Sequence, residues 1–203
     1  MENLQKNLQE LYPSQEYYII QANLGDLDSV NNIFAQLFEV QTIVFASGQA
    51  LYQLLEDTSS QDMELVWRTH VQSPMSIIGQ LAPKLRRNTK SYIVMIGSIW
   101  GETGAAGETV YSAVKGAQHA FVKAYAKEAG SSGVRVNAIA PGFIDTKMNR
   151  SLDDEERQVI ENDIPLNQMG KPQDVANLVS FLTSGNGDYI TGQVLRVNGG
   201  WYI

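Results

Sequence analysis

Short apolar runs alternate with longer, more polar stretches along most of the chain. The short runs are rich in β-branched and aromatic residues, as strands are, and three are almost entirely apolar, as in parallel strands covered on both faces. The longer stretches predict helices, and in the longest of them apolar residues recur at close to a 3.6-residue period. The predicted strands are residues 17–20, 42–45, 92–96, 134–139 and 193–197, and the predicted helices are about residues 2–12, 28–38, 61–87, 108–129, 152–162 and 172–183.

This alternation predicts the α/β fold class, with a Rossmann-like doubly wound parallel sheet. We expect residues 1–203 to form a single domain, because no internal repeat, low-complexity tract or linker interrupts the pattern. Pro74 lies inside the predicted helix at residues 61–87. It predicts a kink or a break there, because proline has no amide hydrogen for the helical ladder.

Composition and charge narrow the function classes. The 203 residues include no cysteine, which excludes disulfides, thiolate zinc sites and a cysteine nucleophile. A net charge of −7 disfavours nucleic acid as a partner, since binding the phosphate backbone needs a basic face. No apolar run reaches about 18 residues and the first residues are polar, so we expect no membrane span and no signal peptide, and a cytoplasmic location.

One stretch of the chain combines residues suited to the reduction of a carbonyl. Ser98 comes just after the predicted strand 92–96, where open α/β sheets place ligands. Tyr111 and Lys115 are four residues apart in the predicted helix 108–129, so their side chains project from one face. A tyrosine hydroxyl titrates near ~10, and a nearby ammonium lowers that pKa. Tyr111 could therefore donate a proton, Lys115 could tune the pKa of that tyrosine, and the Ser98 hydroxyl could polarise a carbonyl. A lone Tyr-x-x-x-Lys is nevertheless more often an ordinary pair on a helix surface.

Separated motifs, found in the expected order, resemble the classical short-chain dehydrogenase/reductase family. The serine, tyrosine and lysine match its Ser…Tyr-x-x-x-Lys catalytic set. Residues 137–146 (NAIAPGFIDT) resemble the segment that contacts the nicotinamide end of the cofactor, and residues 189–193 (YITGQ) with 197–200 (VNGG) resemble the C-terminal signature. The resemblance runs from about residue 15 to the end. It implies reduction of a carbonyl to an alcohol with NADP as cofactor, NAD remaining open, in a homo-oligomer that is a dimer or a tetramer.

Within the family, the chain is most similar to the 3-oxoacyl-carrier-protein reductases, which implies a carrier-protein-linked or small-molecule carbonyl substrate. A narrower resemblance is to bacterial reductases that act on the 5-aminopentanone group attached to elongation factor P. It is carried by residues 98–104 (SIWGETG) and 115–119 (KGAQH). The sequence leaves this choice of substrate open.

The resemblance also assigns cofactor-binding residues, with departures from the family pattern. Where the family has Asn-Asn-Ala-Gly after its fourth strand, residues 45–48 read Phe-Ala-Ser-Gly, so we expect the backbone turn to remain and side-chain hydrogen bonds to be lost. Asn23 replaces an aspartate beside the adenine pocket and can accept a hydrogen bond without the charge. The assigned residues are Asn23, Ala46, Ser47, Gly48, Tyr111, Lys115, Pro141, Gly142, Ile144 and Thr146.

The fourth catalytic position is His70, where the family has an asparagine that helps hold a water linking the lysine to solvent. An imidazole titrates near ~6.5 and its ring nitrogens suit a similar role. We hypothesise that His70 joins the proton relay. The alternative, a buried histidine that simply finds a hydrogen-bond partner, is equally compatible with the sequence.

The largest departure is the absence of the glycine-rich turn that cradles the cofactor pyrophosphate in the family. Before residue 17 the sequence holds only a polar helix, so we expect the family's first two strands and first helix to have no counterpart and the first βαβ unit to be lacking. The predicted strand at 17–22 then loses its neighbour, and the strand at 42–45 becomes an open edge. Either the orphan strand pairs with that edge, or the chain is part of a longer product.

Other features leave rival interpretations. Residues 84–90 hold four cations and could dock an acidic protein partner, although cations at a helix end are the simpler interpretation. Trp100 and Trp201 could line a substrate pocket or lie in the core. A non-catalytic scaffold that keeps the helices but holds no cofactor is a second candidate function. A serine hydrolase using Ser98 and His70 is disfavoured, because no Gly-x-Ser-x-Gly motif surrounds the serine.

Overall fold

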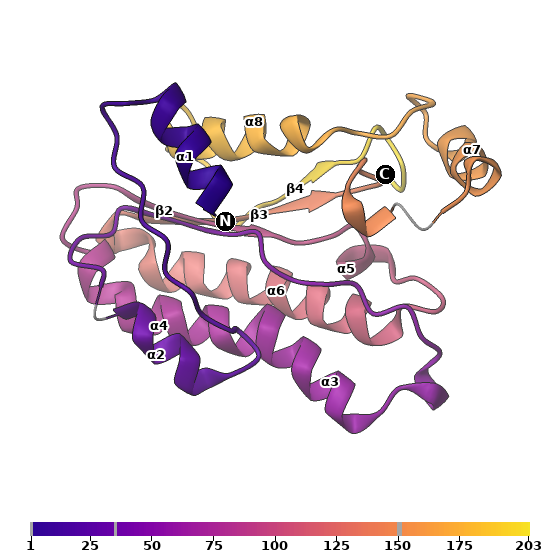
Figure 1. The fold of residues 1–203 in the computed structure, drawn as a ribbon, viewed down its shortest axis with the longest axis horizontal. Helices are drawn as coiled ribbons and strands as arrows, with labels where there is room; N and C mark the ends of the chain where they lie inside the picture. The colour runs from indigo at the N-terminus through magenta and orange to yellow at the C-terminus, as the bar shows by residue number, and fades with distance from the viewer. Residues whose placement is uncertain (1, 35, 150–151) are drawn as a thin grey trace.

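A four-stranded parallel sheet forms the centre of the molecule in the computed structural model, which describes residues 2–34, 36–149 and 152–203 (Figure 1). The strand order is β1-β2-β3-β4. The strands are β1 (Thr42–Phe45), β2 (Ser91–Ile96), β3 (Val134–Pro141) and β4 (Val194–Val197). Most residues of β2 and β3 are buried, as expected for apolar strands covered on both faces.

Helices cover both faces of this sheet. Figure 1 shows α4 and α6 below it and α8 above it, the arrangement of a doubly wound α/β fold. The fold class predicted from the sequence is therefore confirmed. The helices are α1 (Glu2–Leu11), α2 (Leu27–Phe34), α3 (Ser60–Trp67), α4 (Ser73–Leu85), α5 (Trp100–Thr103), α6 (Thr109–Ala129), α7 (Asp154–Asp163) and α8 (Pro172–Thr183), with short 3₁₀ turns at Leu55–Asp57, Gly130–Ser132 and Lys147–Asn149.

The principal core lies between the sheet and the layer of α4 and α6. Most of its side chains are buried, and their packing positions α6 against β2 and β3. Among the described helices, none combines the length and the apolar character that crossing a membrane requires. The most deeply buried members of this core are Leu85, Ile93, Val122, Ala129, Val136 and Ala138.

The long helix predicted at residues 61–87 is present, but it contains a π-helical turn. α3 begins after Ser59, whose side chain accepts a hydrogen bond from the Asp62 backbone amide. The π turn spans Arg68–Gln72, directly before Pro74 in the first turn of α4. Pro74 has no amide hydrogen to donate to the carbonyl of His70, and the wider turn accommodates this loss without a break.

The strand predicted at residues 17–20 does not form, which corrects the sequence interpretation. These residues are irregular, Tyr18 is 79% exposed, and within the described part of the chain β1 pairs with β2 alone. A strand needs a partner for its backbone groups, and the segment does not cross to the open edge of β1. It lies instead beside α1, where the Gln5 side chain donates a hydrogen bond to the Tyr17 carbonyl.

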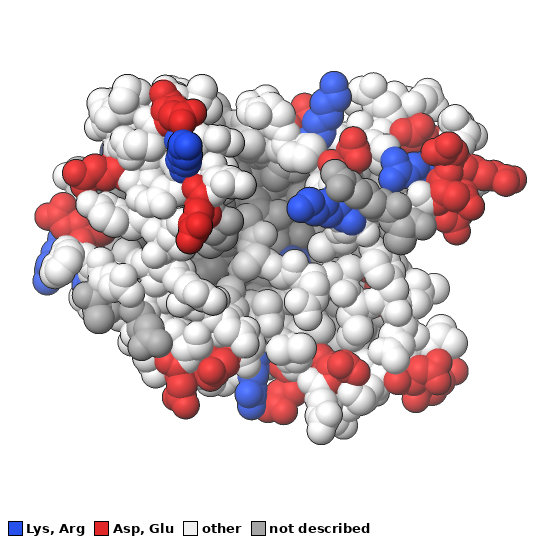
Figure 2. Space-filling model, viewed as in Figure 1, with Lys and Arg blue, Asp and Glu red and all other residues white. Residues whose placement is uncertain are grey.

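The acidic helix α7 stands at one end of the molecule. Figure 2 shows acidic side chains gathered over it. Asp153 caps the helix by accepting from the Glu156 amide at 2.8 Å, and Glu156 bonds back to the Asp153 amide. Three acidic residues in the first turn complement the positive end of the helix dipole, so local chemistry accounts for this charge cluster.

Candidate active site

The catalytic residues predicted from the sequence meet at the carboxyl end of β2. Ser98 follows this strand by two residues, and Tyr111 and Lys115 come from the first turns of α6, which packs against β3. All three side chains are buried. The position agrees with the rule that open α/β sheets place ligands beyond the carboxyl ends of their strands.

Ser98 and Tyr111 are joined by a hydrogen bond between their hydroxyl groups. The Ser98 oxygen also accepts from the Trp100 backbone amide at 3.2 Å, which fixes its direction. Burial raises the pKa of Tyr111, and electrostatic contributions from Glu108 and Tyr52 add to this, while the bond with Ser98 lowers it. Tyr111 is therefore a neutral phenol with a proton to give at neutral pH.

Lys115 lies close to this pair, but its contacts differ from the expectation. Its Nζ donates to the Ile96 carbonyl at 2.9 Å and lies 5.4 Å from the centre of the Tyr111 ring. Burial lowers the pKa of Lys115 to about 8. We expected Lys115 to lower the pKa of Tyr111; in this structure the pKa is raised instead, because burial outweighs any effect of the ammonium.

His70 is placed beside Tyr111 by the π turn. The two rings meet edge to face with centroids 5.7 Å apart, and the histidine is 1% exposed. Its Nε2 lies 3.0 Å from the Gln49 carbonyl and 3.3 Å from the Gln49 amide, whereas Nδ1 has no partner among the described residues. Burial, with a contribution from Lys115, lowers the pKa of His70 to about 4, so the imidazole is neutral near pH 7.

Gln118 makes a contact that the sequence did not indicate. Its amide nitrogen donates to the His70 carbonyl at 2.6 Å, the acceptor that Pro74 cannot serve. The Gln118 side chain is 2% exposed, and its Oε1 has no partner among the described residues. This bond ties α6 to the π turn and holds His70 in place beside Tyr111.

Glu108 and Tyr52 also belong to the site, although sequence reasoning missed both. Glu108 directly precedes α6, is 8% exposed, and accepts a hydrogen bond from the Trp100 indole. Burial raises its pKa, and its charge acts on both Tyr52 and Tyr111. The available signal was a carboxylate three residues before Tyr111, on the helix turn that carries the proton donor.

The predicted turn after β1 lies against His70. Gly48 has a φ of +140°, and a Cβ atom there would come within 2.2 Å of His70 Cε1. The backbone conformation and the close packing both require glycine. Ala46 and Ser47 precede this turn directly after the end of β1, so the cofactor-binding residues predicted here are positioned next to the catalytic centre.

The predicted nicotinamide-side segment, residues 137–146, runs through the second half of β3 and into the loop after it, next to the loop that carries Ser98. The Ile99 amide donates to the Pro141 carbonyl at 3.1 Å, and the Gly142 amide donates to the Val197 carbonyl at 2.9 Å. Ile144 forms an isolated bridge with Gly170, and the carbonyl of Thr146 accepts from the Asn149 amide. These bonds hold the segment between the serine loop and β4.

Asn23 is used locally in this structure. Its Oδ1 accepts from the Gly25 backbone amide at 3.0 Å, and the Asn23 backbone amide donates to the Ser29 hydroxyl at 2.8 Å. The side chain thus stabilises the turn that leads into α2. Its predicted contact with the adenine side of a cofactor remains a prediction.

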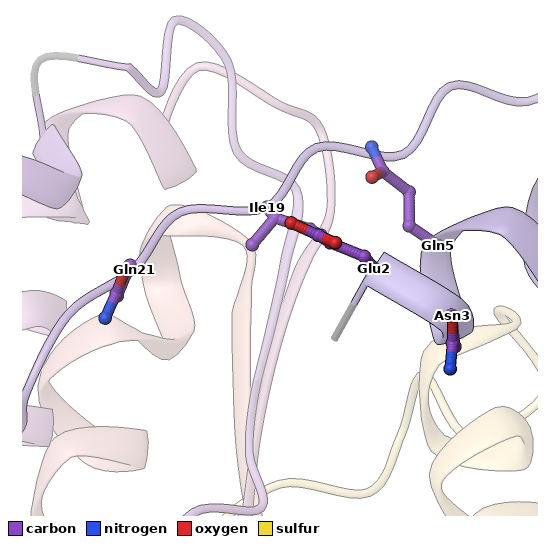
Figure 3. Close-up of a pocket in the computed structure, with 5 residues that line it drawn as sticks. All are labelled: Glu2, Asn3, Gln5, Ile19 and Gln21. Carbon is purple, nitrogen blue, oxygen red and sulfur yellow. The ribbon is translucent and has the colours of Figure 1, made fainter.

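Two surface hollows differ in their relation to this site. The larger, about 640 Å³, lies between α1 and the irregular segment at residues 19–21 (Figure 3). It is lined by Glu2, Asn3, Gln5, Ile19 and Gln21, none of which is a predicted site residue. The second, about 450 Å³, is lined by residues that include Tyr52 and Gly107, the chain neighbour of Glu108.

The side chains of three of the four cations of residues 84–90 have partners among the described residues. Lys84 donates to the Phe34 and Leu37 carbonyls at the end of α2, and Lys90 pairs with Asp188. Arg86 forms a hydrogen bond with Tyr125. These contacts favour a structural role at the end of α4.

Comparison with known proteins agrees with this geometry. The family model described as enoyl-(acyl carrier protein) reductase matches residues 1–202. An uncharacterized oxidoreductase of Bacillus subtilis is 41% identical over 185 residues, covering 91% of this chain and 76% of its own length. A 3-oxoacyl-[acyl-carrier-protein] reductase of Staphylococcus aureus is 34% identical over 190 residues, covering 92% of this chain and 77% of the other.

Two solved structures show the same fold. A blue fluorescent protein from a metagenomic library, in complex with NADPH, has a TM-score of 0.89 and 29% identity, covering 100% of this chain and 83% of the other. A short-chain dehydrogenase/reductase of Brucella melitensis has a TM-score of 0.87 and 25% identity, with the same coverage. With its serine, tyrosine and lysine brought together at the end of β2, the chain belongs to the short-chain dehydrogenase/reductase family of oxidoreductases.

Proposed function

We propose that the protein reduces a carbonyl to an alcohol, with NADPH as the hydride donor. The observation that carries this proposal is the buried pair of hydroxyl groups on Ser98 and Tyr111, with the Lys115 ammonium beside the tyrosine ring. A serine hydrolase is not favoured, since the Ser98 hydroxyl bonds to Tyr111 and His70 Nε2 is engaged by Gln49.

The residues present suit the nicotinamide end of such a cofactor. Lys115 has three N–H groups and gives one to the Ile96 carbonyl, which leaves donors for ribose hydroxyls. Gly48 leaves the space of a side chain to the His70 ring, so the turn at residues 46–48 packs against the site. Lys115, Tyr111 and the segments 46–48 and 141–146 would hold this end. When bound, NADPH supplies the hydride that the carbonyl carbon receives.

The chain's own residues then handle the carbonyl oxygen. The Ser98 hydroxyl donates a hydrogen bond that orients the oxygen, and Tyr111 transfers its phenolic proton to it as negative charge develops. The raised pKa of Tyr111 ensures that the proton is present at neutral pH. After the transfer, the Lys115 ammonium, 5.4 Å from the ring centre, stabilises the phenolate.

Two substrate classes follow from the sequence. A 3-oxoacyl group on a carrier protein is supported by the relatives named 3-oxoacyl-[acyl-carrier-protein] reductase. Reduction of the 5-aminopentanone group on elongation factor P is the alternative, and the buried carboxylate of Glu108 near Tyr111 favours it, since that group carries an amine. A cytoplasmic protein that assembles as a dimer or tetramer remains part of the proposal.

Replacing Tyr111 with phenylalanine tests the proposed reaction. The variant loses the proton donor and keeps the ring, so we expect the rate of NADPH oxidation with a ketone to fall by about 10²–10⁴-fold. Binding of NADPH, followed by intrinsic tryptophan fluorescence, should be retained. An unchanged rate would contradict the role of Tyr111. A wild-type chain that fails to bind millimolar NADPH would favour the non-catalytic scaffold.

A further inference from the structure

Glu108 is a buried carboxylate without a cationic partner in the described part of the chain. It is 8% exposed, and the ion pairs among the described residues do not include it. Its only side-chain donor there is the neutral indole of Trp100. An ionised carboxylate removed from water is costly unless a cation or several donors compensate. A positively charged ligand could therefore supply the compensating charge that Glu108 lacks among the described residues.

Three aromatic side chains interact with this carboxylate. Trp100 donates to it, while Tyr52 and Tyr111 both respond to its charge. Trp100 also packs edge to face against Trp201 and Tyr202, with ring centres 5.2 Å and 5.4 Å away, which holds the indole in place. A carboxylate framed by aromatic rings matches the chemistry of a protonated amine, which gains both a charge-assisted hydrogen bond and cation–π attraction.

A surface hollow lies beside the residues that directly precede Glu108. The hollow of about 450 Å³ is lined by Tyr52 and by Gly107, the chain neighbour of Glu108. Glu108 directly precedes α6, Tyr111 lies in the first turn of that helix, and the charge of Glu108 acts on Tyr111, so the two side chains lie near each other. A ligand bound at Glu108 is thus within a few carbon atoms of the Tyr111 hydroxyl.

We propose that Glu108 is a specificity-determining residue that binds the positively charged amine of a carbonyl substrate whose oxygen is protonated by Tyr111. This inference rests on the proposed carbonyl reduction and narrows its substrates to ketones that carry an amine a few bonds from the carbonyl. A neutral or anionic acyl chain at this position would leave the buried carboxylate uncompensated or face it with a like charge.

A matched pair of small ketones tests the assignment. One is a methyl ketone with a protonated dimethylamino group three methylene groups from the carbonyl; the other carries an isopropyl group in its place, with the same shape and no charge. Isothermal titration calorimetry measures the binding of each to the full chain. The variants are Glu108→Gln, which keeps an oxygen for the Trp100 indole, and Glu128→Gln, an exposed position near the far end of the same helix.

We expect the wild type and Glu128→Gln to bind the charged ketone about 10- to 100-fold more tightly than its neutral analogue, the range of a charge-assisted hydrogen bond. Glu108→Gln should lose this preference while its affinity for the neutral ketone stays the same. Equal binding of the two ketones by the wild type, no binding of either, or a preference retained in Glu108→Gln would overturn the assignment.

NADPH oxidation with both ketones separates this inference from the proposed function. If neither ketone is reduced although the charged one binds through Glu108, the reduction fails and the amine site stands. If both are reduced at the same kcat/KM and Glu108→Gln changes neither value, the reduction stands and the amine site is wrong. Reduction of the charged ketone with a kcat/KM that falls 10- to 100-fold in Glu108→Gln supports both.

Discussion

At the scale of single residues, the site depends on close packing around His70. Gly48 takes a φ of +140° and faces the imidazole so closely that a Cβ atom would lie 2.2 Å from Cε1. Gly48→Ala must therefore shift the turn or the ring. We expect the free energy of unfolding to fall by about 1–3 kcal/mol and NADPH affinity to fall with it, as measured by urea denaturation and fluorescence titration.

Gly79 provides the matched control, because it lies exposed inside α4 and a Cβ atom added there would have nothing within 4 Å. Gly79→Ala adds the same methyl group in a helix interior and should raise stability by up to about 1 kcal/mol. If the two variants change the free energy of unfolding equally, the close contact between Gly48 and His70 does not contribute to stability.

At the scale of elements, the catalytic geometry depends on how α5 packs on α6. A Cβ atom on Gly101 would lie 2.7 Å from the Lys115 backbone carbon, and the Gly101 amide donates to the Ser98 carbonyl at 3.0 Å. Gly101→Ala therefore moves α5 outward and displaces Ser98 from Tyr111. Because a misplacement of about 1 Å costs roughly 100-fold in rate, we expect kcat to fall by about that factor.

Steady-state kinetics of ketone reduction checks this expectation, with Gly130→Ala as the control. Gly130 follows α6 and has nothing within 4 Å of its would-be Cβ, at an ordinary φ. Its substitution should leave kcat unchanged. A Gly101→Ala enzyme with wild-type kcat would show that the contact between α5 and α6 does not set the position of Ser98.

Most elements could be predicted from the sequence, and the exceptions depend on tertiary contacts. The apolar periodicity located α6 and α8, and the strands at 92–96 and 134–139, because burial on one or both faces leaves a direct pattern. The short α5 leaves no such pattern. Residues 17–20 have strand-like composition, but a strand forms only with a partner, which local composition does not encode.

In the candidate site too, the sequence spacing predicts some residues, whereas others depend on tertiary contacts. Ser98, Tyr111 and Lys115 were found because their spacing is itself the signal. Glu108 was missed because a glutamate before a helix is ordinary in sequence, and its burial and its indole partner arise only when α5 folds against α6. The raised pKa of Tyr111 likewise follows from burial, and the spacing of tyrosine and lysine does not predict how deeply the tyrosine is buried.

At the scale of the whole molecule, two buried histidines couple folding to pH. Burial lowers the pKa of both His70 and His119 to about 4 from 6.5. Between these values the unfolded chain binds more protons than the folded chain, so stability rises with pH across this range. The free energy of unfolding that depends on each neutral histidine is fully present above about pH 6.5 and is lost as the pH falls towards 4.

The expected loss is about 3 kcal/mol for each histidine, since one pKa unit corresponds to about 1.4 kcal/mol. Glu108 acts in the opposite direction, because its raised pKa lets the folded chain take up a proton before the unfolded chain does. The pH dependence of wild-type stability therefore combines several groups. Comparison with His70→Asn isolates the contribution of His70. Urea denaturation at pH 7 and at pH 4.5 should show a smaller loss of stability in His70→Asn than in the wild type. Equal losses in the two proteins would mean that His70 titrates normally in the folded chain, and that its imidazole is open to solvent.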